Sequence, residues 1–214
     1  MLSLALDGPS DAVPLALLAD LKADLEITDN SSDARLNRLL LTASSLALDY
    51  IGRPIIAGEW QETIRVSPGE HLHEIVLSVF PVSDVRSIEH DGTLWGQEQL
   101  ETLGLDAQAG LLSLQSHPRH GRWRHGLYII SYQAGFTPPS LIDGTPNVGT
   151  LPASISQAVL VTASALFSAG ARDPNLKSES VQGVGSTSWN VSSGTGGLPQ
   201  SAADMLEAYK GGHF

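Results

Sequence analysis

Three arginines and three histidines lie within one run of nine residues, His117–His125 (HPRHGRWRH). Imidazole nitrogens are frequent metal ligands, so metal binding is the first chemistry to consider. A metal site also needs ligands that converge on one point. The Pro and Gly of this run place it in a turn, and it contains no carboxylate. We therefore expect no metal site.

The same run offers chemistry for contact with a partner. Arginine and tryptophan together bind nucleic acid through phosphate and stacking contacts. Two other interpretations stay open: a solvated hairpin tip between two strands, and a contact with an acidic neighbouring subunit. The candidate residues for contact with a subunit or another partner are Arg119, Arg122 and Arg124.

No enzymatic motif is present elsewhere in the chain. Gly183 and Gly185 lack the third glycine and the strand–helix context of a dinucleotide site. A Gly-x-Ser-x-Gly elbow, a His-Glu-x-x-His pair and a phosphate-binding loop are all absent from the sequence. The carboxylates are abundant but scattered, so the sequence nominates no pair, although it leaves a two-carboxylate hydrolase open. We expect no enzyme, no catalytic residues and no cofactor.

Composition narrows the function classes further. The chain has 214 residues, no cysteine and a net charge of −11. Tight phosphate binding needs basic residues, so this charge argues against a protein that grips nucleic acid. It suits a surface past which DNA slides, and it equally suits ordinary solubility. The absence of cysteine fits a reducing cytoplasm. Residues 2–6 are apolar but lack a preceding basic region, so they do not form a convincing signal peptide.

Apolar residues at three- and four-residue spacing predict two N-terminal helices. Pro14–Glu26 forms the first, and a longer helix follows and ends at Gly52 and Pro54. Asn30, Ser31 and Ser32 offer N-cap oxygens for the longer helix. Leu41 and Leu48 lie off its main apolar face. They predict a second contact, either with the chain's own core or with another subunit.

Period-two alternation replaces the helical spacing from about Glu59 to Gly135. Trp60, Glu62, Ile64 and Val66 share one side of a predicted strand. Asp91-Gly92 is a strong hairpin-turn signal. Five or six short strands of this kind predict a small antiparallel domain.

A second helical block follows. Leu151–Ala171 is a predicted helix with Pro152 in its first turn. The sequence contains no charged residue from Gly144 to Ala171, but the Ser, Thr and Gln content of this helix predicts a buried core helix rather than a membrane span. A last helix is expected at about Gln200–Tyr209.

These elements predict an α+β fold, in which N- and C-terminal helices form a helical bundle with an inserted small antiparallel β domain. The predicted parts are N-terminal helices (1–56), a β-rich insertion (57–136), a loop and core helix (137–176), and a C-terminal arm and helix (177–214). The arm contains a Trp in a Gly/Ser-rich segment, which suits an interface anchor but equally a cover for its own core. The candidate contacts with a partner or a neighbouring subunit are Trp189, Leu198, Leu206, Tyr209 and Phe214.

Several short motifs, taken in order, resemble one family. They are Leu21-Lys22-x2-Leu25-x-Ile27, Leu36-x2-Leu39-Leu40-x2-Ala43, Tyr50-Ile51-x-Arg53-Pro54, Pro81-Val82-x2-Val85-x-Ser87-Ile88, Gly110-Leu111-Leu112, Tyr132-x-Ala134-Gly135, Leu151-Pro152-x2-Ile155-x2-Ala158, Glu179 with Gly183, and Leu198-Pro199 before Leu206-x2-Tyr209. This order is similar to the head–tail connector (adaptor, or head-completion) proteins of long-tailed phages and related gene-transfer particles. The loop Thr137–Thr150 is longer than the usual link in that family.

The resemblance implies a structural protein of the virion neck, assembled in the host cytoplasm. It implies a homo-oligomeric ring, commonly twelve-fold, under the portal protein, with a tail-side completion protein docking below. DNA would pass through the lumen without specific binding, and no membrane is involved. The alternatives are another tail-completion or terminator protein of the virion, and a carbohydrate-binding or hydrolytic β module.

Overall fold

The computed structural model of the chain describes residues 2–9, 13–116, 119–142, 145–170, 178–181, 185–188 and 197–210. Two compact units make up the fold, and each is assembled from two separated segments. Residues 1–11 and 53–137 form the β unit, and residues 12–52 and 138–214 form the helical unit. Side chains are not described at Ser116, Arg119, His120, Ile142 and Pro146, or in 178–181 and 185–188.

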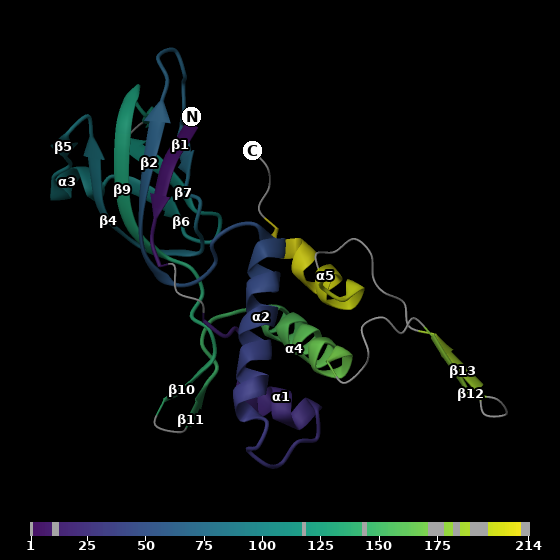
Figure 1. Cartoon of the computed structure of the whole chain (residues 1–214). Helices are drawn as coiled ribbons and strands as arrows, with labels where there is room; N and C mark the ends of the chain where they lie inside the picture. Colours follow the sequence, from purple (N-terminus) through teal and green to yellow (C-terminus); the bar gives the residue numbers. More distant parts are fainter. Residues whose placement is uncertain are drawn as a thin grey trace. The chain divides into compact units, whose positions relative to one another are not determined.

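The main sheet of the β unit has five antiparallel strands in the order β1-β2-β9-β4-β5 (Figure 1). Their bounds are Leu2–Asp7 for β1, Gly58–Val66 for β2, Gly126–Ala134 for β9, Val82–His90 for β4 and Thr93–Leu94 for β5. β2 and β9 pair along their full lengths. The predicted turn at Asp91-Gly92 is confirmed, because it joins β4 to β5.

A second sheet has four short strands. β7 (Leu111–Ser116) is flanked by β3 (Glu74–Val76) and β6 (Leu103–Asp106), and β8 (Arg119–His120) also pairs with β7. The short helix α3 (Gln97–Leu100) precedes β6. Ile64 and Ile130 of the main sheet share one buried cluster with Ile75 and Leu112 of the second sheet. The two sheets therefore enclose a single core.

The predicted fold class, a helical bundle with a small inserted β domain, is wrong. Antiparallel sheet dominates the structure, with five strands in one sheet and four in the other. The β part is also not a simple insertion, because β1 precedes the helices in sequence and pairs with β2. The prediction failed because β1, β6 and β8 are short and were not recognised as strands in the sequence.

The helical unit contains α1 (Leu18–Asp24), α2 (Asp33–Ile51), α4 (Ala153–Ala169) and α5 (Gln200–Leu206), with a 3-10 turn at Glu207–Tyr209. α2 packs against α4 and α5, and α1 packs against both α2 and α4 (Figure 1). Two hairpins lie in the same unit: β10 (Ser140–Ile142) with β11 (Thr145–Asn147), and β12 (Ser178–Val181) with β13 (Gly185–Ser188).

The helical pattern predicted for α2 is confirmed. Leu36, Leu40, Ala43, Ala47 and Ile51 are buried, as expected for one face of a helix. Gly52 adopts a left-handed conformation (φ 68°), and its N–H donates to the Leu48 carbonyl. This is the predicted glycine end of the helix.

The predicted N-cap of α2 is confirmed in its position but not in its hydrogen bond. Ser32 occupies the cap position, but no side-chain oxygen accepts a hydrogen bond there. The neighbouring polar side chains bond elsewhere, since Asn30 accepts from Lys22 and Ser31 donates to Asp29.

The charge-poor helix α4 is a core helix, as predicted. Ile155, Ala158, Val159 and Ala163 are buried. Its partly exposed end meets the Arg35 guanidinium, which lies 4.7 Å from the Phe167 ring centroid. Of the helices described, none combines the length and the apolarity that a membrane span requires.

Candidate interaction surfaces

A groove of about 570 Å³ opens on the β unit. Aromatic side chains from distant parts of the chain form its wall: His90 ends β4, Trp95 follows β5, and Tyr128 lies in β9. Trp95 stacks on the buried Trp123 with ring centroids 5.6 Å apart, and His90 stacks on Tyr128 at 4.4 Å. These contacts fix the orientation of the aromatic rings.

Tyr128 is held at both ends. Its ring packs edge-on against Trp123, and its hydroxyl donates a 3.0 Å hydrogen bond to the Arg124 carbonyl. Burial raises the pKa of the Tyr128 phenol, so the hydroxyl stays a neutral donor. The groove wall is therefore rigid and only weakly polar.

Two arginines make the edge of the groove cationic. Arg122 and Arg124 are exposed and line it, together with the amides Gln99 and Gln115. The residues that line the groove include no carboxylate. Within the described part of the chain, neither guanidinium forms an ion pair. Residues 107–142 contain no Asp or Glu at all, so this cationic edge lies in a carboxylate-free stretch of an acidic chain.

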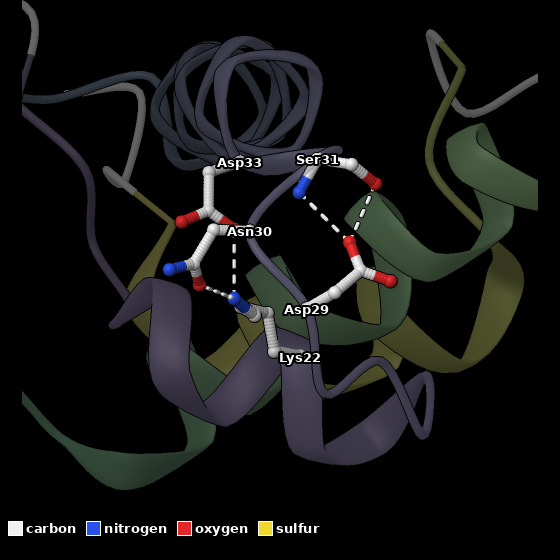
Figure 2. A network of polar contacts seen from close by, with 5 residues as sticks. All are labelled: Lys22, Asp29, Asn30, Ser31 and Asp33. Atoms are coloured by element: carbon white, nitrogen blue, oxygen red, sulfur yellow. Dashed lines mark hydrogen bonds and ion pairs between the residues drawn. The ribbon is translucent and has the colours of Figure 1, made fainter.

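The segment that runs from α1 through the α1–α2 turn to the first residue of α2 has the opposite charge. Residues 20–33 carry five carboxylates and one lysine. Figure 2 shows how that lysine is used: the Lys22 ammonium donates to Asn30 Oδ1 at 2.7 Å and pairs with Asp33 Oδ1 at 2.8 Å. Asp29 accepts from both the backbone N–H and the hydroxyl of Ser31, and these bonds lower the pKa of its carboxyl. The turn is thus ordered and keeps a net negative charge.

Glu26 has an unusual backbone conformation in this turn. Its φ is +56°, in the left-handed region that glycine favours. The N–H of Ile27 donates to the Lys22 carbonyl, and that of Glu26 donates to the Ala23 carbonyl. This is the bonding pattern of a Schellman motif, in which the left-handed position is usually glycine. An exposed glutamate therefore occupies a position where its side chain costs stability.

Replacing this residue by glycine is expected to stabilise the protein. Glu26→Gly should raise the free energy of unfolding by about 1 kcal/mol, because left-handed backbone is strained for a residue with a Cβ. Urea denaturation followed by circular dichroism measures it. Glu26→Ala is the matched control, since it removes the carboxylate but keeps the Cβ, and it should bring no such gain. Equal gains for both variants would assign the effect to charge instead.

The predicted contact residues of the C-terminal arm fall into two groups. Leu198 and Leu206 are buried, at 1% and 0% exposure, so in this structure they stabilise α5 within its own unit. Tyr209 is partly exposed, and its hydroxyl lies 2.8 Å from Ser154 Oγ. Trp189 and Phe214 lie outside the described residues. The role of these residues in contacting a partner stays a prediction.

An exposed polar network surrounds the end of α5. The Tyr50 hydroxyl donates to Glu207 at 2.7 Å, and the Lys210 ammonium pairs with the same carboxylate at 3.0 Å. Both contacts lower the pKa of Glu207, with the bond from Tyr50 first. The network ties the last described residues to α2.

The role of the basic run in contacting a subunit or the tail stays a prediction. Arg122 and Arg124 do lie together on the groove, while Arg119 is described only as backbone in β8. The aromatic wall was missed, because His90 in β4, Trp95 after β5 and Tyr128 in β9 are brought together only by the sheet pairing. Among the described residues, no group of three or more His, Asp or Glu side chains is placed to hold a metal.

Leu41, one of the two off-stripe residues of α2, is 37% exposed, whereas Leu48 is partly buried. Leu41 therefore remains available for contact with another subunit. Which partner uses this second face stays a prediction.

The β unit presents a groove with a cationic edge, and the helical unit presents an acidic segment. The family model described as head completion protein (HCP) matches residues 16–211. The chain therefore belongs to the head completion protein family, as the ordered motifs predicted. A comparison with curated protein sequences finds no match.

Solved structures with a similar fold come from gene transfer agent (GTA) particles. A chain from the neck of an empty GTA particle, computed with C6 symmetry, matches at TM-score 0.56 and 15% identity, covering 99% of this chain and 97% of that one. A chain from the virion of a native GTA particle matches at TM-score 0.56 and 14% identity, with the same coverage. A chain from the neck of a native GTA particle, computed with C12 symmetry, matches at TM-score 0.55 and 14% identity. At these identities the match establishes the fold.

Proposed function

We propose that this protein is a structural component of the head–tail neck of a phage or a phage-like particle. The observation that carries the proposal is family membership over residues 16–211. The fold likeness supports it, because it extends over nearly the whole of both chains and the similar chains come from particle necks.

In this proposal the chain forms a homo-oligomeric ring, twelve-fold in the particle, beneath the portal protein. The ring extends the DNA channel and presents a docking surface for the tail-side completion protein. The C12 symmetry of one of the similar neck structures supports the ring. The net charge of −11 supports a channel through which DNA passes without being held. A family of head completion proteins favours a structural role over an enzymatic one.

Particle imaging tests the proposal. A small epitope tag is placed in the exposed turn at Gly69, where a Cβ would meet nothing within 4 Å. Particles carrying the tagged chain are labelled with gold-coupled antibody and examined by electron microscopy. We expect label at the head–tail junction, and filled heads without attached tails when the chain is absent. Label at the far end of the tail would favour another tail-completion protein, and unlabelled, fully assembled particles would overturn the structural role.

A further inference from the structure

The groove on the β unit has the properties of a site for an acidic protein segment. Its wall of His90, Trp95 and Tyr128 is held rigid by ring stacking, and Arg122 and Arg124 at its edge make no ion pair within the described residues. Aromatic and arginine side chains are the residues most enriched at binding hot spots. Unpaired arginines beside a rigid apolar wall favour a ligand that brings carboxylates.

The chain itself carries a segment of matching charge. Residues 20–33, which span most of α1, the α1–α2 turn and the first residue of α2, have a net charge of −4, since they hold five carboxylates and one lysine. Asp20, Asp24 and Glu26 are exposed there, and they form no ion pair among the described residues. The Lys22 network keeps the turn in one conformation (Figure 2), so little ordering would be needed on binding.

We propose that the α1–α2 turn of one copy of this chain docks into the groove on the β unit of the next copy. A ring requires a head-to-tail contact, in which each copy offers two different, complementary surfaces. The groove and the turn are such a pair, and each carries the charge that the other lacks. The inference rests on the proposed ring and adds which surfaces form it.

The conformation of Glu26 agrees with this role. A glutamate at φ +56° is less stable than a glycine there, so the isolated chain gains nothing from it. In the proposed contact, its exposed carboxylate faces Arg122 or Arg124 of the next copy. The variant Glu26→Gly should therefore be more stable and yet assemble less well, a combination that a purely structural residue would not produce.

Cross-linking between two copies tests the contact directly. The chain has no cysteine, so single introduced cysteines report one position each. Copies carrying Gln99→Cys at the groove are mixed with copies carrying Thr28→Cys in the turn, both at exposed positions. Disulfide-linked dimers are quantified after mild oxidation, with the purified protein and with assembled particles. Ser45→Cys, exposed on α2, replaces Thr28→Cys as the control.

We expect the groove–turn pair to cross-link about tenfold faster than the control pair. Reversing the groove charges with Arg122→Glu and Arg124→Glu should lower the cross-linking rate about tenfold. Reversing the acidic charges with Asp24→Lys and Glu26→Lys should lower it by a similar factor. Combining the reversed groove on one copy with the reversed turn on the other should restore it. Arg65→Glu, which reverses an exposed arginine elsewhere on the β unit, should change nothing.

Two results would overturn the contact. One is a groove–turn rate equal to the control rate in both protein and particles, and the other is a combined reversal that does not restore cross-linking. Gold label at the neck together with either result would leave the proposed function standing and reject only this pairing.

Discussion

Replacing Glu62 by glutamine is expected to lower the free energy of unfolding by about 3 kcal/mol, although the two side chains have nearly the same size and shape. Glu62 is only 1% exposed. Its carboxylate accepts from the Ser3 hydroxyl at 2.8 Å, from the Tyr132 hydroxyl at 3.1 Å, and from the Ser78 N–H and hydroxyl at 2.9 and 2.7 Å. Four donors surround two acceptor oxygens, and an amide would turn a donor toward some of them.

The charge on Glu62 has no cation to balance it among the described residues, so these hydrogen bonds carry its stabilisation. Burial, and then the nearby Glu62 charge, raise the pKa of Tyr132, so its hydroxyl remains a donor throughout the physiological range. Tyr132→Phe removes one of the four donors and should cost about 2 kcal/mol by itself.

Urea denaturation of both variants measures these losses. Glu74→Gln is the matched control, because Glu74 is exposed on β3, and it should stay within about 0.5 kcal/mol of the parent protein. A Glu62→Gln protein as stable as the control would mean that the network contributes nothing net to folding.

Gly135→Ala should destabilise the β unit by about 3 kcal/mol or more, which makes it the second large effect. Gly135 follows β9 and has a φ of +103°. A Cβ there would lie 2.4 Å from the carbonyl oxygen of Ile56 and 2.7 Å from the nitrogen of Ala57, both backbone atoms that cannot rotate away. Two backbone hydrogen bonds hold the chain in this place: the Gly135 N–H donates to the Pro81 carbonyl, and the Phe136 N–H donates to the Ile55 carbonyl.

Gly69→Ala separates the two causes of that effect. Gly69 also has a positive φ, +88°, but a Cβ there meets nothing within 4 Å. It should therefore cost only the backbone strain, about 1 kcal/mol. Thermal unfolding of the two variants side by side gives the difference, which is the cost of the clash. Similar losses at both positions would show that the close approach to Ile56 is relieved at little cost.

The sequence predicted those elements whose pattern lies within one segment, and it missed those that depend on pairing with a distant segment. α2 was predicted well because Leu36, Leu40 and Ile51 repeat at helical spacing within one segment and Gly52 ends it. β1 was missed, since its alternation covers only Leu2–Asp7 and its partner β2 lies beyond two helices. A strand this short forms because it pairs with a neighbouring strand, and its own residues show little β preference.

The groove was also only partly visible in the sequence, because sheet pairing brings its residues together. Arg122 and Arg124 were visible as neighbours in sequence, but Trp95 and Tyr128 join them only through the sheet. Glu62 was placed in phase with Trp60 and Ile64 by alternation, which would have predicted its burial. A carboxylate on an apolar face is rarely buried, and only its four tertiary donors explain why this one is.

The interleaved segments of the two units set the order in which they can fold during synthesis. The β unit has all its strands once the ribosome has passed Ala134, although β1 must wait for β2 to emerge. The helical unit lacks α4 and α5 until Leu206 has been made. Nascent chains can therefore complete the two sheets of the β unit before the helical unit, and α2 spends that interval without the cover of α4 and α5. That interval is when a nascent chain is most open to wrong association with its neighbours on the same messenger RNA.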